Sequence, residues 1–249
     1  MAILLILYMI WLAHHDTLTN ETVVSENVPE AFHDFTIFFI ADIHRRTIRE
    51  QTIYSFETTV DAVFIGGDLI ERGVSFERMV ANIRTLKHYQ APIYFVWGNN
   101  DYETVPKKII DLLTAEKVII LEDTVHKIHR GSEYLNLVGF DFYYDKQSQP
   151  LVNWQLVDQS YTVLLTHKPS AYEHLHADER AKIDLVLAGH THGGQIRLFG
   201  FGLYKNGGFS KMDHTTLFVT EGYGYTLLPF RLGTKSQCHL ITLKHINNV

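Results

Sequence analysis

Two histidines, His190 and His192, stand two residues apart in a glycine-rich segment directly after the mostly apolar run 183–188. The run is typical of a buried strand, because a short aliphatic stretch that ends at a glycine fits a covered sheet. Side chains two apart at a strand end point the same way, so both imidazoles can face one place. Neutral imidazole is the commonest metal ligand in proteins. The pair therefore indicates metal binding, with a polar surface loop as the alternative.

Four further apolar runs also end in polar side chains that can bind a metal. They are residues 35–41, followed by Asp42 and His44; 62–65, followed by Gly67 and Asp68; 92–97, followed by Asn99, Asn100 and Asp101; and 161–166, followed by His167. In layered α/β proteins, ligands bind just beyond the carboxyl ends of the strands. The five strand ends together favour metal binding over the surface loop.

The elements that must position these side chains can be predicted from the same chain. Ser75 precedes an apolar stripe at helical spacing over 76–86, and Pro106 opens a second one over 106–113. Short runs over 118–142 predict antiparallel strands with a hairpin, and two more strands are expected at 217–220 and 238–243. The pattern predicts an α/β fold in which two mixed sheets pack face to face and are flanked by helices.

The donors at the strand ends mix oxygen with nitrogen. Asp42 and His44 can reach one cation, and the Asp68 carboxylate can bridge two cations. The remaining donors are the Asn99 carbonyl oxygen and the imidazoles of His167, His190 and His192. Such a mixture suits manganese, iron or zinc better than calcium, which takes oxygen ligands only. Two divalent cations about 3.5–4 Å apart can hold a bridging hydroxide and clamp a phosphoryl oxygen during in-line displacement.

The ordered set of motifs resembles the calcineurin-like metallophosphoesterase superfamily from about residue 35 to the C-terminus. The motifs are Asp42-x-His44, Gly67-Asp68, Gly98-Asn99-Asn100-Asp101, His167 and Gly189-His190-Thr191-His192. The resemblance implies a four-layer α/β-β/α sandwich that hydrolyses a phosphodiester, pyrophosphate or phosphomonoester. It also implies one cation held by Asp42, His44, Asp68 and His192, and a second held by Asp68, Asn99, His167 and His190. The segments 167–169, 189–197 and 227–231 are similar to a bacterial membrane-associated branch of phosphodiesterases and UDP-diacylglucosamine pyrophosphatases.

Asn100 departs from the family pattern, which has a histidine at this position. That histidine is credited with contacting the phosphate and protonating or orienting the leaving group. An amide can donate a hydrogen bond to a phosphate oxygen but cannot act as a general acid. We therefore predict that Asn100 contacts the substrate and takes part in catalysis. Asp68 is predicted to act in catalysis as the ligand that bridges the two cations. Arg45 is predicted to contact the substrate, with a solvated side chain as the alternative. Asp101 is expected to orient its neighbours.

The departure at Asn100 also leaves an alternative function open. A catalytically weakened scaffold of the same fold could keep its metals and use them to hold a partner. Seven unaltered ligand residues argue for the enzyme, because a pure scaffold is free to lose them.

Residues 2–13 are uninterrupted apolar sequence that would span only about 18 Å as a helix. A bilayer core needs roughly 20 residues, so the segment is the end of a membrane anchor, an interfacial segment or a core element. Trp11 near its polar boundary favours the anchor. We expect an apolar anchor over 1–15, a linker over 16–34 and the phosphoesterase domain over 35–249. The protein then belongs to the cell membrane, or otherwise to the cytoplasm.

The composition of the 249 residues allows one substantial core and narrows the expected partners. The net charge is −6 and the chain has no block rich in lysine and arginine, so nucleic acid is not expected as a partner. A phosphorylated small molecule or a lipid-linked substrate needs only a local positive site. The single cysteine, Cys238, cannot form an internal disulfide, so cysteine usage decides nothing about the compartment.

Overall fold

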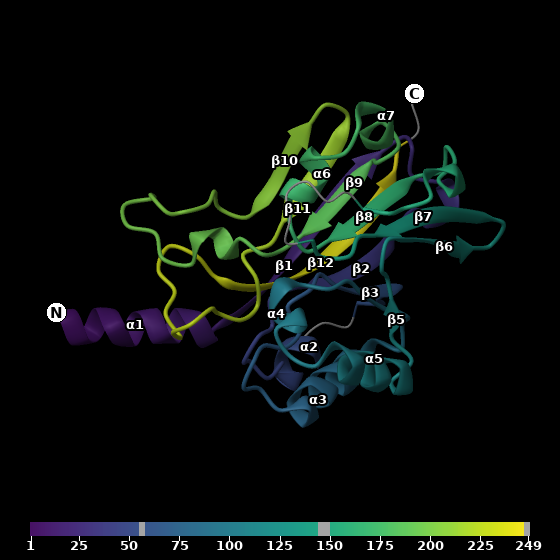
Figure 1. The fold of residues 1–249 in the computed structure, drawn as a ribbon. Coiled ribbons are helices and arrows are strands. Elements are labelled where there is room, and N and C mark those ends of the chain that lie inside the picture. Colours follow the sequence, from purple (N-terminus) through teal and green to yellow (C-terminus); the bar gives the residue numbers. More distant parts are fainter. Residues whose placement is uncertain (55–57, 144–149, 247–249) are drawn as a thin grey trace.

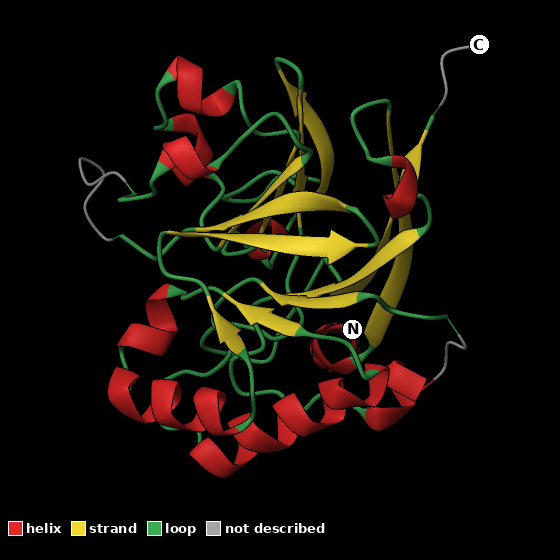
Figure 2. Cartoon of the chain, turned by 90° about the vertical axis from the view of Figure 1, so that its right-hand side faces the viewer, coloured by secondary structure: helices red, strands yellow, loops and turns green. Residues whose placement is uncertain are grey.

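Two six-stranded mixed sheets form the centre of the molecule, and helices cover their outer faces (Figures 1 and 2). This computed structural model describes residues 1–54, 58–143 and 150–246. The arrangement confirms the predicted α/β class with two flanked mixed sheets.

The first sheet has the strand order β1-β12-β2-β3-β4-β5. Its strands are β1 (Asp16–Ser25), β2 (Phe35–Ile40), β3 (Ala62–Ile65), β4 (Ile93–Phe95), β5 (Ile119–Ile120) and β12 (Ser236–His245). Only the β12–β2 pair is antiparallel, so β2, β3 and β4 run side by side in one direction. Ile40 pairs with Ile65, and Ile65 with Phe95, which places the residues that follow these strands at one sheet edge.

The second sheet has the order β10-β11-β9-β8-β7-β6. Its strands are β6 (Thr124–Arg130), β7 (Glu133–Gly139), β8 (Thr162–Thr166), β9 (Leu185–Ala188), β10 (Gly208–Met212) and β11 (Thr215–Val219). The antiparallel β6–β7 pair is the hairpin expected from the sequence. Strands β7, β8, β9 and β11 are parallel, and Thr166 pairs with Ala188 at the ends of β8 and β9.

The two helices that begin at Phe76 and Pro106 lie where apolar spacing and the residues that open them predict helices, and the described residues form seven helices in all. They are α1 (Ala2–His14), α2 (Glu50–Tyr54), α3 (Phe76–Leu86), α4 (Asn99–Tyr102), α5 (Pro106–Ala115), α6 (Ser170–Glu173) and α7 (Ala177–Arg180), with short 3₁₀ turns at 30–32, 87–89, 154–156 and 192–194. Ser75 Oγ accepts a hydrogen bond from the Arg78 amide at 3.3 Å and so caps α3. Helix α3 buries Met79 and Ile83 against the first sheet, and α5 buries Ile109 there.

The core is divided among three layers of buried apolar side chains. Between the sheets lie residues such as Phe39, Phe64, Leu165 and Phe218. A second cluster fills the space between the first sheet and its helices, and a third lies on the outer side of the second sheet. Both sheets are therefore covered on two faces, which is why their strands read as continuous apolar runs.

The stretch 16–34 is not the linker expected from its polar composition. Residues 16–25 form β1, which pairs in parallel with β12 from Asp16–Ser236 to Ser25–His245. An edge strand tolerates polar residues, because only part of its surface meets the core, and β-branched Thr and Val suit the pleated backbone. The folded domain therefore begins at Asp16, directly after α1, and not at residue 35.

Helix α1 projects from the body at the N-terminus (Figure 1). Of its residues, only Ala13 is buried. Among the described residues, none of the helices has the length and apolar character needed to cross a membrane.

Candidate metal centre

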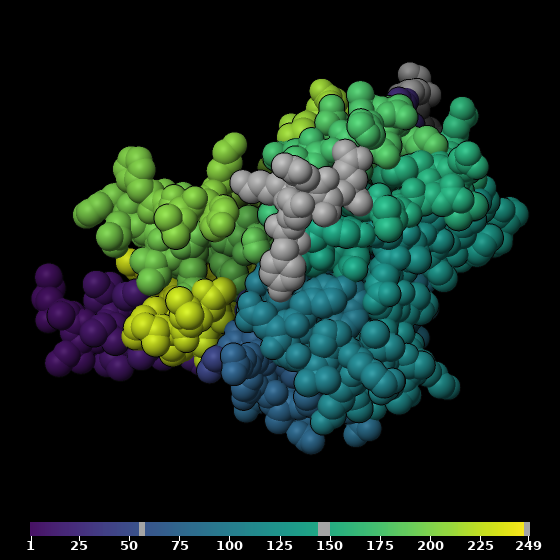
Figure 3. Space-filling view, in the orientation of Figure 1, coloured from purple at the N-terminus to yellow at the C-terminus, as the bar shows by residue number. Residues whose placement is uncertain are grey.

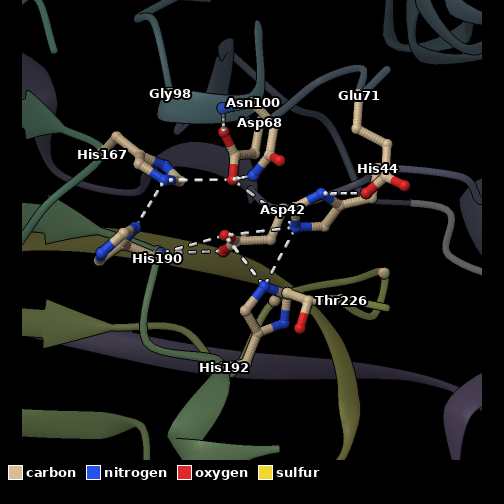
Figure 4. A network of polar contacts seen from close by, with 12 residues as sticks. Asp42, His44, Asp68, Glu71, Gly98, Asn100, His167, His190, His192 and Thr226 are labelled. Carbon is tan, nitrogen blue, oxygen red and sulfur yellow. Dashed lines mark hydrogen bonds and ion pairs between the residues drawn. The ribbon is translucent and has the colours of Figure 1, made fainter. Parts of the chain in front are cut away.

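Seven side chains that follow five strands meet at the edge where the two sheets come together, and all of them except Asn99 are labelled in Figure 4. They are Asp42 and His44 after β2, Asp68 after β3, Asn99 after β4, His167 after β8, and His190 and His192 after β9. Asp42, His44, Asp68, His190 and His192 all adopt positive φ values between 49° and 72°. Non-glycine residues adopt this backbone only at a cost, and such strain gathers at functional sites.

One donor group is centred on His44. Its Nε2 atom lies 3.1 Å from His192 Nε2 and 3.6 Å from Asp68 Oδ2. Asp42 Oδ1 lies 3.4 Å from His192 Nε2 and 3.9 Å from His44 Nε2. All four side chains are buried.

A second donor group is centred on His167. Its Nε2 atom lies 3.3 Å from Asp68 Oδ2, 3.3 Å from Asn99 Oδ1 and 3.1 Å from His190 Nδ1. His190 Nδ1 also lies 3.1 Å from Asn99 Oδ1. Asp68 Oδ2 therefore contacts histidines of both groups, which is the position expected of a bridging carboxylate.

The donor atoms fit a divalent cation better than they fit one another. In this cluster, imidazole nitrogens of different histidines point toward one another around two buried carboxylates, an arrangement that an ordinary hydrogen-bond network does not have. Asp42, His44 and His192 form one set with ligand atoms within 4.8 Å of one another, and Asp42, Asp68 and His167 form another. A mixture of carboxylate oxygen and imidazole nitrogen suits a transition metal ion.

The electrostatics of the cluster show the same demand for positive charge. Burial opposes the charged form of His167, yet the Asp68 and Asp42 carboxylates and the Gly66 carbonyl together outweigh burial and raise the pKa of His167 to about 9. Burial, and next the charge of His167, lowers the pKa of His190 to about 4. Burial raises the pKa of Asp42. The carboxylates thus draw one proton onto His167, and a metal cation would take the place of that proton.

Two contacts hold two of the candidate ligand histidines in orientation. Glu71 Oε2 lies 3.1 Å from His44 Nδ1, and the Gly66 carbonyl oxygen lies 2.9 Å from His167 Nδ1. Each contact engages Nδ1 and leaves Nε2 facing the cluster, as outer contacts do in metal sites. Sequence reasoning missed Glu71, although an acidic residue three positions after Asp68 was an available signal.

Asn100 and Asp101 fix the loop around Asp68. Asn100 donates from its backbone amide to Asp68 Oδ1 at 2.8 Å and from Nδ2 to Asp68 Oδ2 at 2.7 Å. Asp101 accepts hydrogen bonds from the amides of Asp68, Gly98 and Ile70 at 2.8–3.0 Å. The prediction that Asp101 orients its neighbours is confirmed. Gly98 is required here, because a Cβ atom would lie 2.2 Å from Asp68 Oδ1.

Two arginines border the cluster. Arg45 is half exposed and donates to Glu71, so its contact with a phosphate stays a prediction. Arg231 is fully buried, with Nη2 3.2 Å from His192 Nδ1 and 2.6 Å from the Glu221 carbonyl oxygen. Arg231 therefore supports the backbone beneath His192, a role that the sequence alone does not reveal.

A cavity opens beside His190 and His192. Its wall is completed by segments that are distant in sequence, including Gln195, Leu203, Tyr204 and Thr226. The cavity gives the cluster a path to the molecular surface.

Comparison with known proteins defines the class. A family model described as calcineurin-like phosphoesterase matches residues 35–194, which is more than half of the chain. The chain therefore belongs to the calcineurin-like phosphoesterase family.

Individual relatives extend the match over most of the chain. The uncharacterized protein YpbG of Bacillus subtilis is 36% identical over 215 residues, which cover 84% of this chain and 80% of YpbG. A zebrafish protein named transmembrane protein with metallophosphoesterase domain is 27% identical, over 88% of this chain and 55% of its own length. The 5'-nucleotidase precursor of Thermus thermophilus has a similar fold, with a TM-score of 0.52 at 12% identity over 84% of this chain and 54% of that one.

Proposed function

We propose that the chain is a hydrolase with a binuclear metal centre that cleaves a phosphodiester, pyrophosphate or phosphomonoester. The observation that carries the proposal is Asp68, whose Oδ2 atom faces both histidine groups. One manganese, iron or zinc ion would be held by Asp42, His44, Asp68 and His192, and a second by Asp68, Asn99, His167 and His190. Two bound cations supply an acidified water and stabilise the charge that develops on the phosphoryl group.

The protein's own residues prepare the site for this reaction. Asp68 is held by two hydrogen bonds from Asn100, so its carboxylate keeps one orientation toward both groups. Asn100 Nδ2 can offer its second N–H to a phosphate oxygen, but it has no proton to give to a leaving group. This favours substrates whose leaving group needs no proton, such as a pyrophosphate or an acidic phosphodiester. The resemblance of segments 167–169, 189–197 and 227–231 to a branch of phosphodiesterases and UDP-diacylglucosamine pyrophosphatases, which rests on the sequence, supports that preference.

Hydrolysis of bis(4-nitrophenyl) phosphate by the purified full chain tests the proposal. We expect turnover that depends on added Mn²⁺, and we expect Asp68→Asn to abolish it. Asp111→Asn, a change at an exposed helix position outside the cluster, is the matched control and should keep full activity. Failure to hydrolyse any activated monoester, diester or pyrophosphate with Mn²⁺, Fe²⁺ or Zn²⁺ would exclude the enzyme.

A metal-binding scaffold is the second candidate, and Asn100 is the observation that favours it. Restoring the family residue with Asn100→His separates the two. A weakened hydrolase should gain about 10²–10⁴-fold in kcat/KM on diesters with poor leaving groups, because imidazole can supply the missing general acid. The gain should be far smaller on 4-nitrophenyl esters. A scaffold should show no turnover in either form.

A further inference from the structure

Three segments that are distant in sequence form one protruding apolar face. The apolar face consists of α1, residues 196–204 and residues 225–228, which gather at one end of the molecule (Figure 3). The Met9 carbonyl oxygen accepts a hydrogen bond from the Arg231 amide at 3.1 Å, and the rings of His14 and Tyr225 lie 5.5 Å apart. The Gln195 side chain exchanges two hydrogen bonds with the Thr226 backbone, at 2.8 and 3.1 Å. The three segments are therefore bound to one another.

The apolar face exposes large side chains almost completely. Phe199, Phe201, Leu203 and Leu227 are 99%, 82%, 91% and 89% exposed, and α1 exposes every residue from Ile3 to Tyr8. Scattered apolar side chains are normal on a protein surface, whereas a continuous apolar patch marks an interaction site.

The most exposed side chain lies on a strained and braced turn. Leu198 and Phe201 exchange two backbone hydrogen bonds of 2.9 Å, so Phe199 and Gly200 form the tip between them. Both tip residues have positive φ, 50° and 85°, a geometry that favours Asn-Gly. Arg197 braces the turn by donating to the carbonyl oxygens of Gly193 and Gly200 at 2.9 and 2.6 Å. A phenylalanine held outward at such a position indicates that its exposure serves a function.

The shape and charge of the apolar face fit a lipid bilayer better than a protein groove. Six successive exposed apolar residues cover all sides of α1, and a helix that is apolar all round needs an apolar medium rather than a one-sided protein groove. Residues 1–15, 195–212 and 222–236 contain no aspartate or glutamate, although the whole chain carries −6. Lys205 and Lys235 are exposed in these segments, which complements anionic headgroups.

We propose that the apolar face docks onto an anionic lipid bilayer, with α1 and residues 199–203 inserted into one leaflet. Helix α1 would reach about 20 Å, enough to enter one leaflet of a core about 30 Å thick. Leu203, Tyr204 and Thr226 also line the cavity beside His190 and His192, so docking turns that cavity toward the headgroups. The substrate is then a phosphoester carried by a lipid, a consequence that rests on the proposed function.

Flotation of the metal-free full chain with vesicles tests the docking itself. We expect binding to phosphatidylcholine vesicles and tighter binding when phosphatidylglycerol is added. Phe199→Ser combined with Phe201→Ser should lower the partition coefficient by about tenfold or more, because two phenyl rings lose their apolar environment. The matched control is Leu151→Ser combined with Leu156→Ser, a pair of exposed leucines outside the apolar face, which should bind as the wild type does.

Hydrolysis of soluble bis(4-nitrophenyl) phosphate separates this proposal from the proposed function. The Phe199/Phe201 variant should keep wild-type turnover of the soluble ester while it loses turnover of a vesicle-borne phosphoester. Vesicle binding without hydrolysis of any ester would support the docking proposal and refute the proposed enzymatic function. The docking is overturned if the wild type does not float with either vesicle, if the leucine pair matters equally, or if the phenylalanines instead hold two copies of the chain together in light scattering.

Discussion

Glu71 lies outside the set of predicted metal ligands but contacts one of them, His44. Its carboxylate lies 3.1 Å from His44 Nδ1 and also accepts from Arg45. We expect Glu71→Gln to weaken metal binding by about 10–100-fold, because the neutral amide orients His44 less firmly and no longer raises its basicity. A calorimetric titration with Mn²⁺ measures this. Arg45→Gln removes only the second partner of Glu71 and should cost less, whereas equal affinity in Glu71→Gln and wild type would refute the role.

At this scale the sequence predicted which side chains come together in the cluster, but it did not predict the contacts that support them. The clustered side chains follow apolar strands directly, so their sequence position alone places them at the strand ends. Glu71 and Arg231 lie on loops whose paths bring them to the cluster, and Arg231 is 39 positions from its contact His192 in the sequence. Such contacts depend on tertiary packing, which periodicity and composition do not encode.

At the scale of elements, β1 is joined to the rest of the first sheet by a buried polar network at its first residue. Asp16 accepts hydrogen bonds from Arg46 Nη2, Thr52 Oγ1 and Tyr223 Oη, each at 2.6 Å. Despite burial, the Arg46 charge and these hydrogen bonds lower the pKa of Asp16. The network ties β1 to the loop that carries His44. Its partners lie far apart in sequence, which explains why the polar stretch 16–34 looked like a linker.

Asp16→Ala should destabilise the protein by about 3–5 kcal/mol, because it leaves the buried Arg46 guanidinium without its counter-charge. Urea denaturation followed by circular dichroism measures the free energy of unfolding. Asp111→Ala is the control, since it breaks an exposed ion pair with Lys107 and should cost no more than about 0.5 kcal/mol. Similar losses in both variants would contradict a buried network.

At the scale of the whole molecule, the two-sheet architecture followed from the order of apolar runs, but the contacts that join the sheets did not. His239 on β12 is an example. Its ring packs against Phe39 of the first sheet and Phe218 of the second, and its nitrogens lie 2.8 Å from Thr19 Oγ1 and 2.7 Å from Thr220 Oγ1. Among fifteen histidines, nothing in the local sequence distinguishes it.

Burial lowers the pKa of His239 from its ordinary 6.5 to about 3, so acid should weaken the contact between the sheets. Between these two pKa values the unfolded chain binds a proton that the folded protein excludes, and the free energy of unfolding therefore falls as the pH falls. From pH 7 to pH 5 this single group should remove about 2 kcal/mol. His239→Gln should flatten the pH dependence of unfolding by that amount, measured by urea titration at each pH. His239→Leu should flatten the pH dependence by the same amount, whatever its effect on stability at neutral pH. The reason is that the pH dependence comes from protonation of the imidazole ring and not from the volume of the side chain. A variant that retains the wild-type slope would place the acid sensitivity elsewhere in the molecule.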